Sequence, residues 1–108
     1  MTARYVLTLQ ARQDLVDIGN YIAEQSGLEP AEHVLEKLRE AFHFLTEQPG
    51  VGHIREDLAD DPAVRFWGVY SYLVAFVPGD RPLPVVSVVH GSRDPDKIRR
   101  HLREATER

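Results

Sequence analysis

Apolar residues near the start of the chain recur at helical spacing. Four of them, separated by 4, 3 and 4 residues, fall on one face of a helix: Ala11, Leu15, Ile18 and Ile22. Asp14 and Asp17 are expected outside that face. Gly27 is expected to end the helix, because glycine readily takes the left-handed conformation found just after many helices.

A second and stronger helical pattern begins at Pro30, which has no N–H and therefore fits the first turn of a helix. Its apolar residues follow at spacings of 3, 1, 3, 3, 1 and 3: Ala31, Val34, Leu35, Leu38, Ala41, Phe42 and Leu45. Pro49 and Gly50 close the pattern. Because the connector between the two helices is short, we expect them to pack antiparallel as a hairpin.

Four segments have the pattern of β-strands. Residues 3–9 have an alternating pattern at Tyr5, Leu7 and Leu9, and residues 64–69, 72–77 and 83–90 are rich in β-branched and aromatic side chains. The short connections between the last three strands are typical of antiparallel hairpins. Strand 72–77 is apolar at every position except the Tyr72 hydroxyl, so we expect it to be central and covered on both faces.

Residues 49–63 form the one long loop of the predicted structure, and a loop of this length is commonly functional or mobile. Asp94 and Pro95 start a last helix, with the aspartate as its cap. Ile98, Leu102 and Ala105 give that helix a thin apolar stripe. The predicted order is βααβββα. This is an α+β fold with an N-terminal strand, a helical hairpin packed on an antiparallel sheet, and a short C-terminal helix.

Length and composition limit the class of protein. A chain of 108 residues, 43% of them hydrophobic, forms one domain, which we place at residues 1–108. The absence of cysteine excludes disulfides, cysteine-ligated zinc and thiol nucleophiles. The longest apolar run, Leu73 to Val77, is far short of the roughly 20 residues of a membrane span. With no apolar signal region at the amino terminus, we expect a cytoplasmic protein without membrane contact.

The charge is distributed unevenly along the chain. The formal net charge is −4, which argues against a protein that coats nucleic acid electrostatically. Residues 1–62 carry a net charge of −7, whereas residues 63–108 carry +3. The basic rear half favours an anionic partner; ordinary solvated surface charge is the alternative interpretation.

Enzymatic chemistry has few candidates in this sequence. The serines lack the G-x-S-x-G context of a hydrolase nucleophile, and the five histidines form no H-x-x-x-H pair. The Gly50-Val51-Gly52 segment lacks the third glycine of a dinucleotide loop and the lysine of a phosphate loop. We therefore expect no catalytic residue, no metal site and no cofactor.

One cluster, at the end of the last strand, leaves an enzymatic alternative open. His90 lies close to Arg93, a pairing that suits a general base and a phosphate clamp in RNA cleavage. In the competing interpretation, Gly91 makes a turn, Asp94 caps the helix and Arg93 pairs with a carboxylate.

Several short motifs occur together in the order that one protein family shows. They are Thr8-Leu9 followed by Ala11, Asp14-Leu15, Ile18 and Tyr21-Ile22; Pro49 with Gly52 and Arg55; Val64-Arg65; Tyr72 to Phe76; and Val88 to Asp94. Over nearly the whole chain they resemble the ParE/RelE superfamily of toxins from bacterial type II toxin–antitoxin pairs. The ending from His90 to Asp94 and the long helical hairpin are more similar to the ParE branch.

The resemblance implies a toxin that binds DNA gyrase and traps its cleaved DNA complex without catalysis of its own. It also implies a ParD-like antitoxin as partner, and no direct sequence-specific binding of nucleic acid by the toxin alone. The alternatives are a RelE-like ribosome-dependent mRNA interferase and a non-toxic interaction domain. The basic catalytic set of the RelE branch is largely missing, since the only lysines are Lys37 and Lys97 and the last tyrosine is Tyr72.

Two sets of residues are candidates for these contacts. Target binding is assigned to one histidine and the arginines of the rear half: Arg65, His90, Arg93, Arg99, Arg100 and Arg103. Antitoxin binding is assigned to aromatic and apolar side chains: Trp67, Tyr70, Tyr72, Ile98 and Leu102. We expect the arginines of the last helix to form a contiguous outward patch. We also expect that helix to leave an apolar groove for an antitoxin segment.

Overall fold

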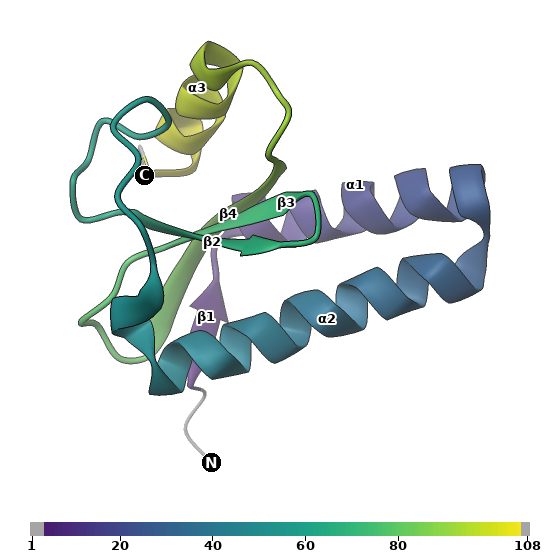
Figure 1. Ribbon diagram of the computed structural model, residues 1–108, viewed down its shortest axis with the longest axis horizontal. Helices are drawn as coiled ribbons and strands as arrows, with labels where there is room; N and C mark the ends of the chain where they lie inside the picture. The colour runs from purple at the N-terminus through teal and green to yellow at the C-terminus, as the bar shows by residue number, and fades with distance from the viewer. Residues whose placement is uncertain (1–3, 107–108) are drawn as a thin grey trace.

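The computed structural model describes residues 4–106 and has the predicted α+β order (Figure 1). Its elements are β1 (Tyr5–Leu7), α1 (Leu9–Ser26), α2 (Leu28–Glu47), the short 3₁₀ helix η1 (Pro49–Val51), β2 (Arg65–Val69), β3 (Tyr72–Phe76), β4 (Leu83–His90) and α3 (Pro95–Thr106). The predicted order βααβββα is therefore confirmed, with η1 as an addition inside the long loop.

The helical hairpin begins earlier than the apolar spacing predicts. Thr8 caps α1, because its Oγ1 accepts a hydrogen bond of 3.0 Å from the Ala11 N–H. Leu9 is consequently in the helix, and within the described residues the strand predicted over residues 3–9 extends from Tyr5 to Leu7; residue 3 lies outside the described part of the chain. Gly27, with φ of 102°, separates the two helices, so α2 starts two residues before Pro30. Figure 1 shows the hairpin extending well beyond the strands.

The four strands form one sheet in the order β1-β4-β3-β2. β2, β3 and β4 are antiparallel neighbours, as the short connections predict. β1 instead runs parallel to β4, with Tyr5 opposite Leu83, a pairing that the prediction of an antiparallel sheet did not include. Parallel strands need a long connection between them, and here the connection includes the helical hairpin. The hairpin carries the chain back across the sheet before β2 begins.

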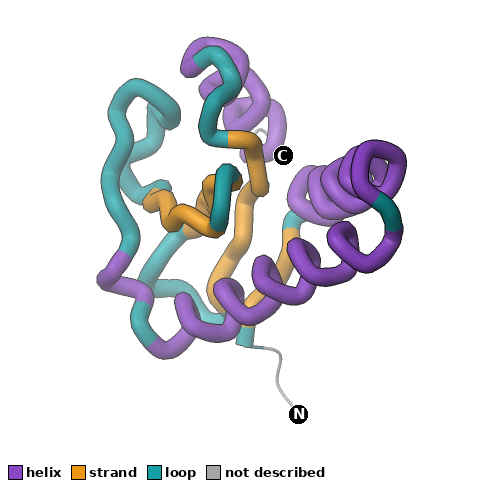
Figure 2. Tube along the Cα trace, turned by 45° about the vertical axis from the view of Figure 1, so that its right-hand side comes forward, coloured by secondary structure: helices purple, strands orange, loops and turns teal. Residues whose placement is uncertain are grey.

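Each face of the sheet is buried under its own layer. On one face, Leu38 and Phe42 of the hairpin pack with Val74 and Phe76. On the other face, the helix α3 and the segment 58–64 pack against the strands. Together they form a second cluster of buried residues: Leu58, Val64, Phe66, Ala75, Val86, Val89, Ile98 and Leu102. Figure 2 shows the strands between these two layers. The prediction that strand 72–77 is covered on both faces is confirmed.

The second layer corrects the expectation of an open apolar groove. α3 alone has a narrow apolar stripe, but Leu58, which is 1% exposed, and Val64 complete the cover from the long loop. The same loop also pairs with β2, since His53 and Phe66 exchange two backbone hydrogen bonds of 2.9 and 2.8 Å. Residues 49–63 thus help to cover and extend the sheet through buried Leu58 and the pairing of His53 with β2.

Candidate functional site

The end of β4 holds the histidine that the sequence singles out. His90 is exposed, and its Nδ1 accepts hydrogen bonds from the Ser92 N–H at 3.2 Å and from the Ser92 side chain, whose Oγ lies 2.7 Å away. Its ring packs edge-on against Tyr72, with 5.3 Å between the ring centroids. Among the described residues no carboxylate is hydrogen-bonded to His90, so the ring lacks the orienting acid of a catalytic triad.

Asp94 caps α3 as predicted, through a hydrogen bond from the Asp96 N–H to its Oδ1.

Two tyrosines lie at the turn beside this histidine. Tyr70 is 65% exposed and has a positive φ of 53°, and its hydroxyl lies 2.9 Å from Nε2 of His33 on α2. Tyr72 is half-buried; burial, and to a smaller extent the nearby Tyr21 of α1, raises the pKa of its hydroxyl. The two tyrosines with His33 and His90 are called the tyrosine–histidine surface below.

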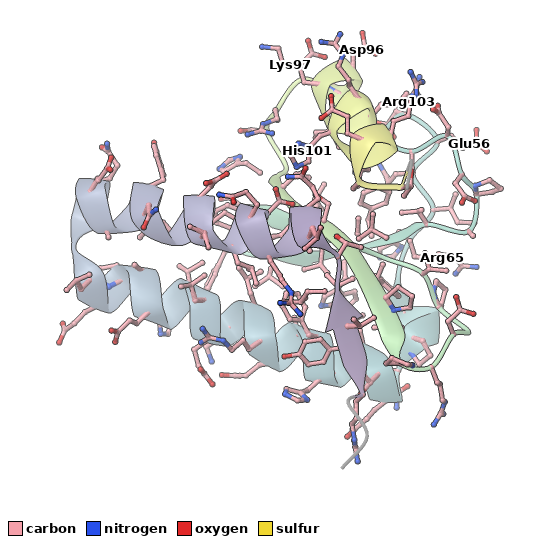
Figure 3. The ribbon with its side chains drawn as sticks, turned by 180° about the vertical axis from the view of Figure 1, so that it is seen from behind. Glu56, Arg65, Asp96, Lys97, His101 and Arg103 are labelled. Atoms are coloured by element: carbon pink, nitrogen blue, oxygen red, sulfur yellow. The ribbon has the colours of Figure 1, made fainter. Side chains whose placement is uncertain are left out.

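Trp67 and Arg65 alternate with buried Phe66 along β2. Trp67 is half-buried, with its ring centroid 5.5 Å from that of Phe44 on α2. Nε of Arg65 is buried and has no hydrogen-bond partner among the described residues. Figure 3 places Arg65 far from Lys97 and Arg103 on α3, so it is not part of one basic patch with them.

Two of the arginines expected in an outward patch are instead bound to the long loop. Arg99 donates to the backbone oxygen of Glu56 at 2.6 Å, and Arg103 pairs with Asp60 at 2.7 Å. Arg93 and Arg100 are exposed and have no ion pair among residues 4–106. The predicted patch is therefore smaller than expected, because the acidic loop folds over α3 and neutralises part of it.

Ile98 and Leu102 are 0% and 3% exposed and belong to the second core cluster. Their apolar stripe faces the sheet, so the chain itself already covers the surface that these two residues were expected to offer an antitoxin. Trp67, Tyr70 and Tyr72 keep exposed area on the other side of the sheet and its turn.

The prediction that Asp14 lies on the outside of the first helix is wrong. Asp14 is 5% exposed, because it accepts hydrogen bonds from β4 and contacts His101 of α3. A signal was available: Asp14 follows the fully buried Ala11 by three residues, so it lies on the same side of the helix. Its charge alone excluded it from the predicted apolar face.

The model of the family described as ParE toxin of the type II toxin-antitoxin system, parDE, matches residues 5–95. This chain belongs to the ParE toxin family. The match spans β1 through the start of α3, and so includes the tyrosine–histidine surface and the arginine Arg93.

A solved structure of the chromosomal ParDE TA system from P. aeruginosa has a similar fold. The TM-score is 0.66 at 19% sequence identity, and the alignment covers 78% of this chain and 90% of that chain. At this identity the likeness concerns the fold. No match was found among curated proteins.

Two further properties describe the ParE-family chain. Within residues 4–106, no three His, Asp or Glu side chains are grouped so as to hold a metal ion. None of the helices described is long and apolar enough to cross a membrane.

Proposed function

We propose that this ParE-family toxin acts by binding DNA gyrase and is neutralised by a ParD-like antitoxin. The family match over residues 5–95 carries the proposal. The surroundings of His90 support a binding protein over an enzyme, because its Nδ1 is occupied by Ser92 and no described carboxylate orients the ring. Arg93 and Arg100, both exposed, are the proposed contacts to the anionic target, together with the exposed His90, whose backbone oxygen accepts a hydrogen bond from the Arg93 N–H.

The antitoxin is proposed to bind at β2 and the adjoining tyrosine–histidine surface. β2 is an edge strand, and among residues 4–106 its outer edge is hydrogen-bonded at Phe66, to the backbone of His53. Gly68, two residues further along, is exposed, so the backbone there is open to an added strand. Trp67 and Tyr70 flank this position and supply aromatic area of the kind that dominates protein interfaces.

A gyrase supercoiling assay with the purified chain tests the target. The wild type should inhibit supercoiling and accumulate cleaved DNA, whereas Arg93→Glu with Arg100→Glu should weaken inhibition by about tenfold or more. The matched control is Arg12→Glu with Arg81→Glu, which makes the same charge change at exposed positions on α1 and the β3–β4 connection and should inhibit like the wild type.

The same assay tests the antitoxin face. Tyr70→Ala should inhibit gyrase normally but need about tenfold more antitoxin for rescue, while Val16→Ala, an exposed apolar position on α1, should behave like the wild type. Ribosome-dependent mRNA cleavage by the wild type would instead favour the RelE-like alternative. Inactivity toward both gyrase and mRNA would favour a non-toxic interaction domain.

A further inference from the structure

A single buried carboxylate joins three elements of the fold. Oδ2 of Asp14, on α1, accepts hydrogen bonds from the Ser87 hydroxyl at 2.5 Å and the Val88 N–H at 2.9 Å, both on β4. Its Oδ1 accepts from the Gln10 side chain at 2.9 Å and lies 2.8 Å from Nε2 of His101 on α3. Asp14 is therefore anchored to α1 and β4, and it offers its remaining contact to α3.

His101 occupies the junction between α3 and α1. Its side chain is 22% exposed, and it precedes Leu102, which is buried against the sheet. Figure 3 shows His101 at the side of α3 that faces the hairpin. The other charged groups around it are Arg93, on the connection from β4, and Glu104 of α3 itself. The polar groups of β4 at this junction, the Ser87 hydroxyl and the Val88 N–H, are bound to the Asp14 carboxylate.

The two partners stabilise each other's charged forms. Burial by itself raises the pKa of Asp14, but hydrogen bonds from His101, Ser87, the Val88 N–H and Gln10 outweigh it, so the net pKa lies below the usual 3.8. The hydrogen bond to Asp14 raises the pKa of His101 above the usual 6.5, against the opposing effects of burial and Arg93. The contact is thus an ion pair in mildly acidic solution.

We propose that His101 and Asp14 form a proton-dependent latch that holds the C-terminal helix α3 against α1. Because docking favours protonated His101, its contribution is fully present below the undocked pKa near 6.5 and is lost as the pH rises through the raised value. The contribution of ionised Asp14 is present above about 3.8 and is lost as the pH falls through its lowered pKa. The latch is strongest between these limits, while burial of Ile98 and Leu102 contributes to the docking of α3 independently of this titration.

Amide hydrogen exchange followed by NMR on the full chain tests the latch. Protection factors, corrected for intrinsic exchange, should fall in α3 by about threefold or more between about pH 5.5 and about pH 8, with smaller changes in α2 and β3. In His101→Gln, which keeps a donor without a titrating charge, α3 protection should be independent of pH. The matched control His90→Gln removes an exposed histidine away from Asp14. In this variant the protection of α3 should change with pH as it does in the wild type.

The NMR titration of His101 gives a second readout that requires no change to the core. Its pKa should lie above 6.5 in the wild type and fall in Asp14→Asn. If Asp14→Asn does not fold, the pKa of His101 in the wild type and the hydrogen-exchange data of His101→Gln still decide whether the latch exists. An unshifted His101 pKa, a pH-independent α3 in the wild type, or an equal loss of protection in every element would overturn the latch.

Discussion

At the scale of single residues, the fold depends on close contacts between segments that are far apart in the sequence. Gly52, in the long loop, lies directly against β2 and β3. A Cβ added there would come within 2.5 Å of Cζ of Phe76 and 3.0 Å of Cβ of Arg65. Phe76 is fully buried and Arg65 is in a strand, so neither can retreat without moving its neighbours.

We therefore predict that Gly52→Ala destabilises the chain by about 1–3 kcal/mol through overpacking. Gly50→Ala, two residues away in η1, is the matched control, because a Cβ at Gly50 would meet nothing within 4 Å. Urea unfolding monitored by fluorescence measures the free energy of unfolding of both variants. Equal stability of the two variants would mean that the loop shifts freely and does not pack as described.

At the scale of elements, the long loop and α3 hold each other in place on the sheet. Their polar contacts are largely solvated: the Arg103 and Asp60 side chains are 55% and 54% exposed. Their apolar contacts are buried, since Leu58 of the loop lies in one cluster with Ile98 and Leu102. Burial of apolar area, more than ion pairing, fixes this layer.

Leu58→Ala should accordingly lower the free energy of unfolding by about 2–5 kcal/mol, because it leaves a cavity in the second core cluster. Ile54→Ala, at a position in the same loop that is 51% exposed, should change stability by about 0.5 kcal/mol or less. Arg103→Ala should cost about 1 kcal/mol at most. Chemical denaturation of the three variants measures these values. A larger loss in Arg103→Ala than in Leu58→Ala would contradict the assignment.

At the scale of the whole molecule, the sheet is enclosed between the helical hairpin and the layer of α3 and loop (Figure 1). The sequence led us to expect an apolar groove on the sheet for an antitoxin segment. The described layers leave no such groove on the sheet. Exposed apolar residues such as Leu9, Val16 and Leu28 instead stand on α1 and at the hairpin connection.

We predict that the chain purified without antitoxin is folded and unfolds cooperatively, because each sheet face has its own cover. Trp67, the only tryptophan, reports on the hairpin side of the sheet, and far-UV circular dichroism reports on all helices. The two urea transitions should coincide. Non-coincident transitions, or a chain that acquires fixed structure only with antitoxin, would contradict this prediction.

The sequence by itself determined the elements and their order, because helical and strand periodicity are local properties of the chain. It also determined the cap at Asp94 and the central place of strand 72–77. Tertiary structure alone decided the parallel partner of β1, the covering role of the long loop, and the pairing of Arg103 with Asp60. It likewise decided that Asp14 is buried, since its partners Ser87 and His101 lie 73 and 87 positions further along the chain. No local pattern specifies such contacts, because whether a charged side chain is solvated or buried depends on which distant polar groups the fold brings to it.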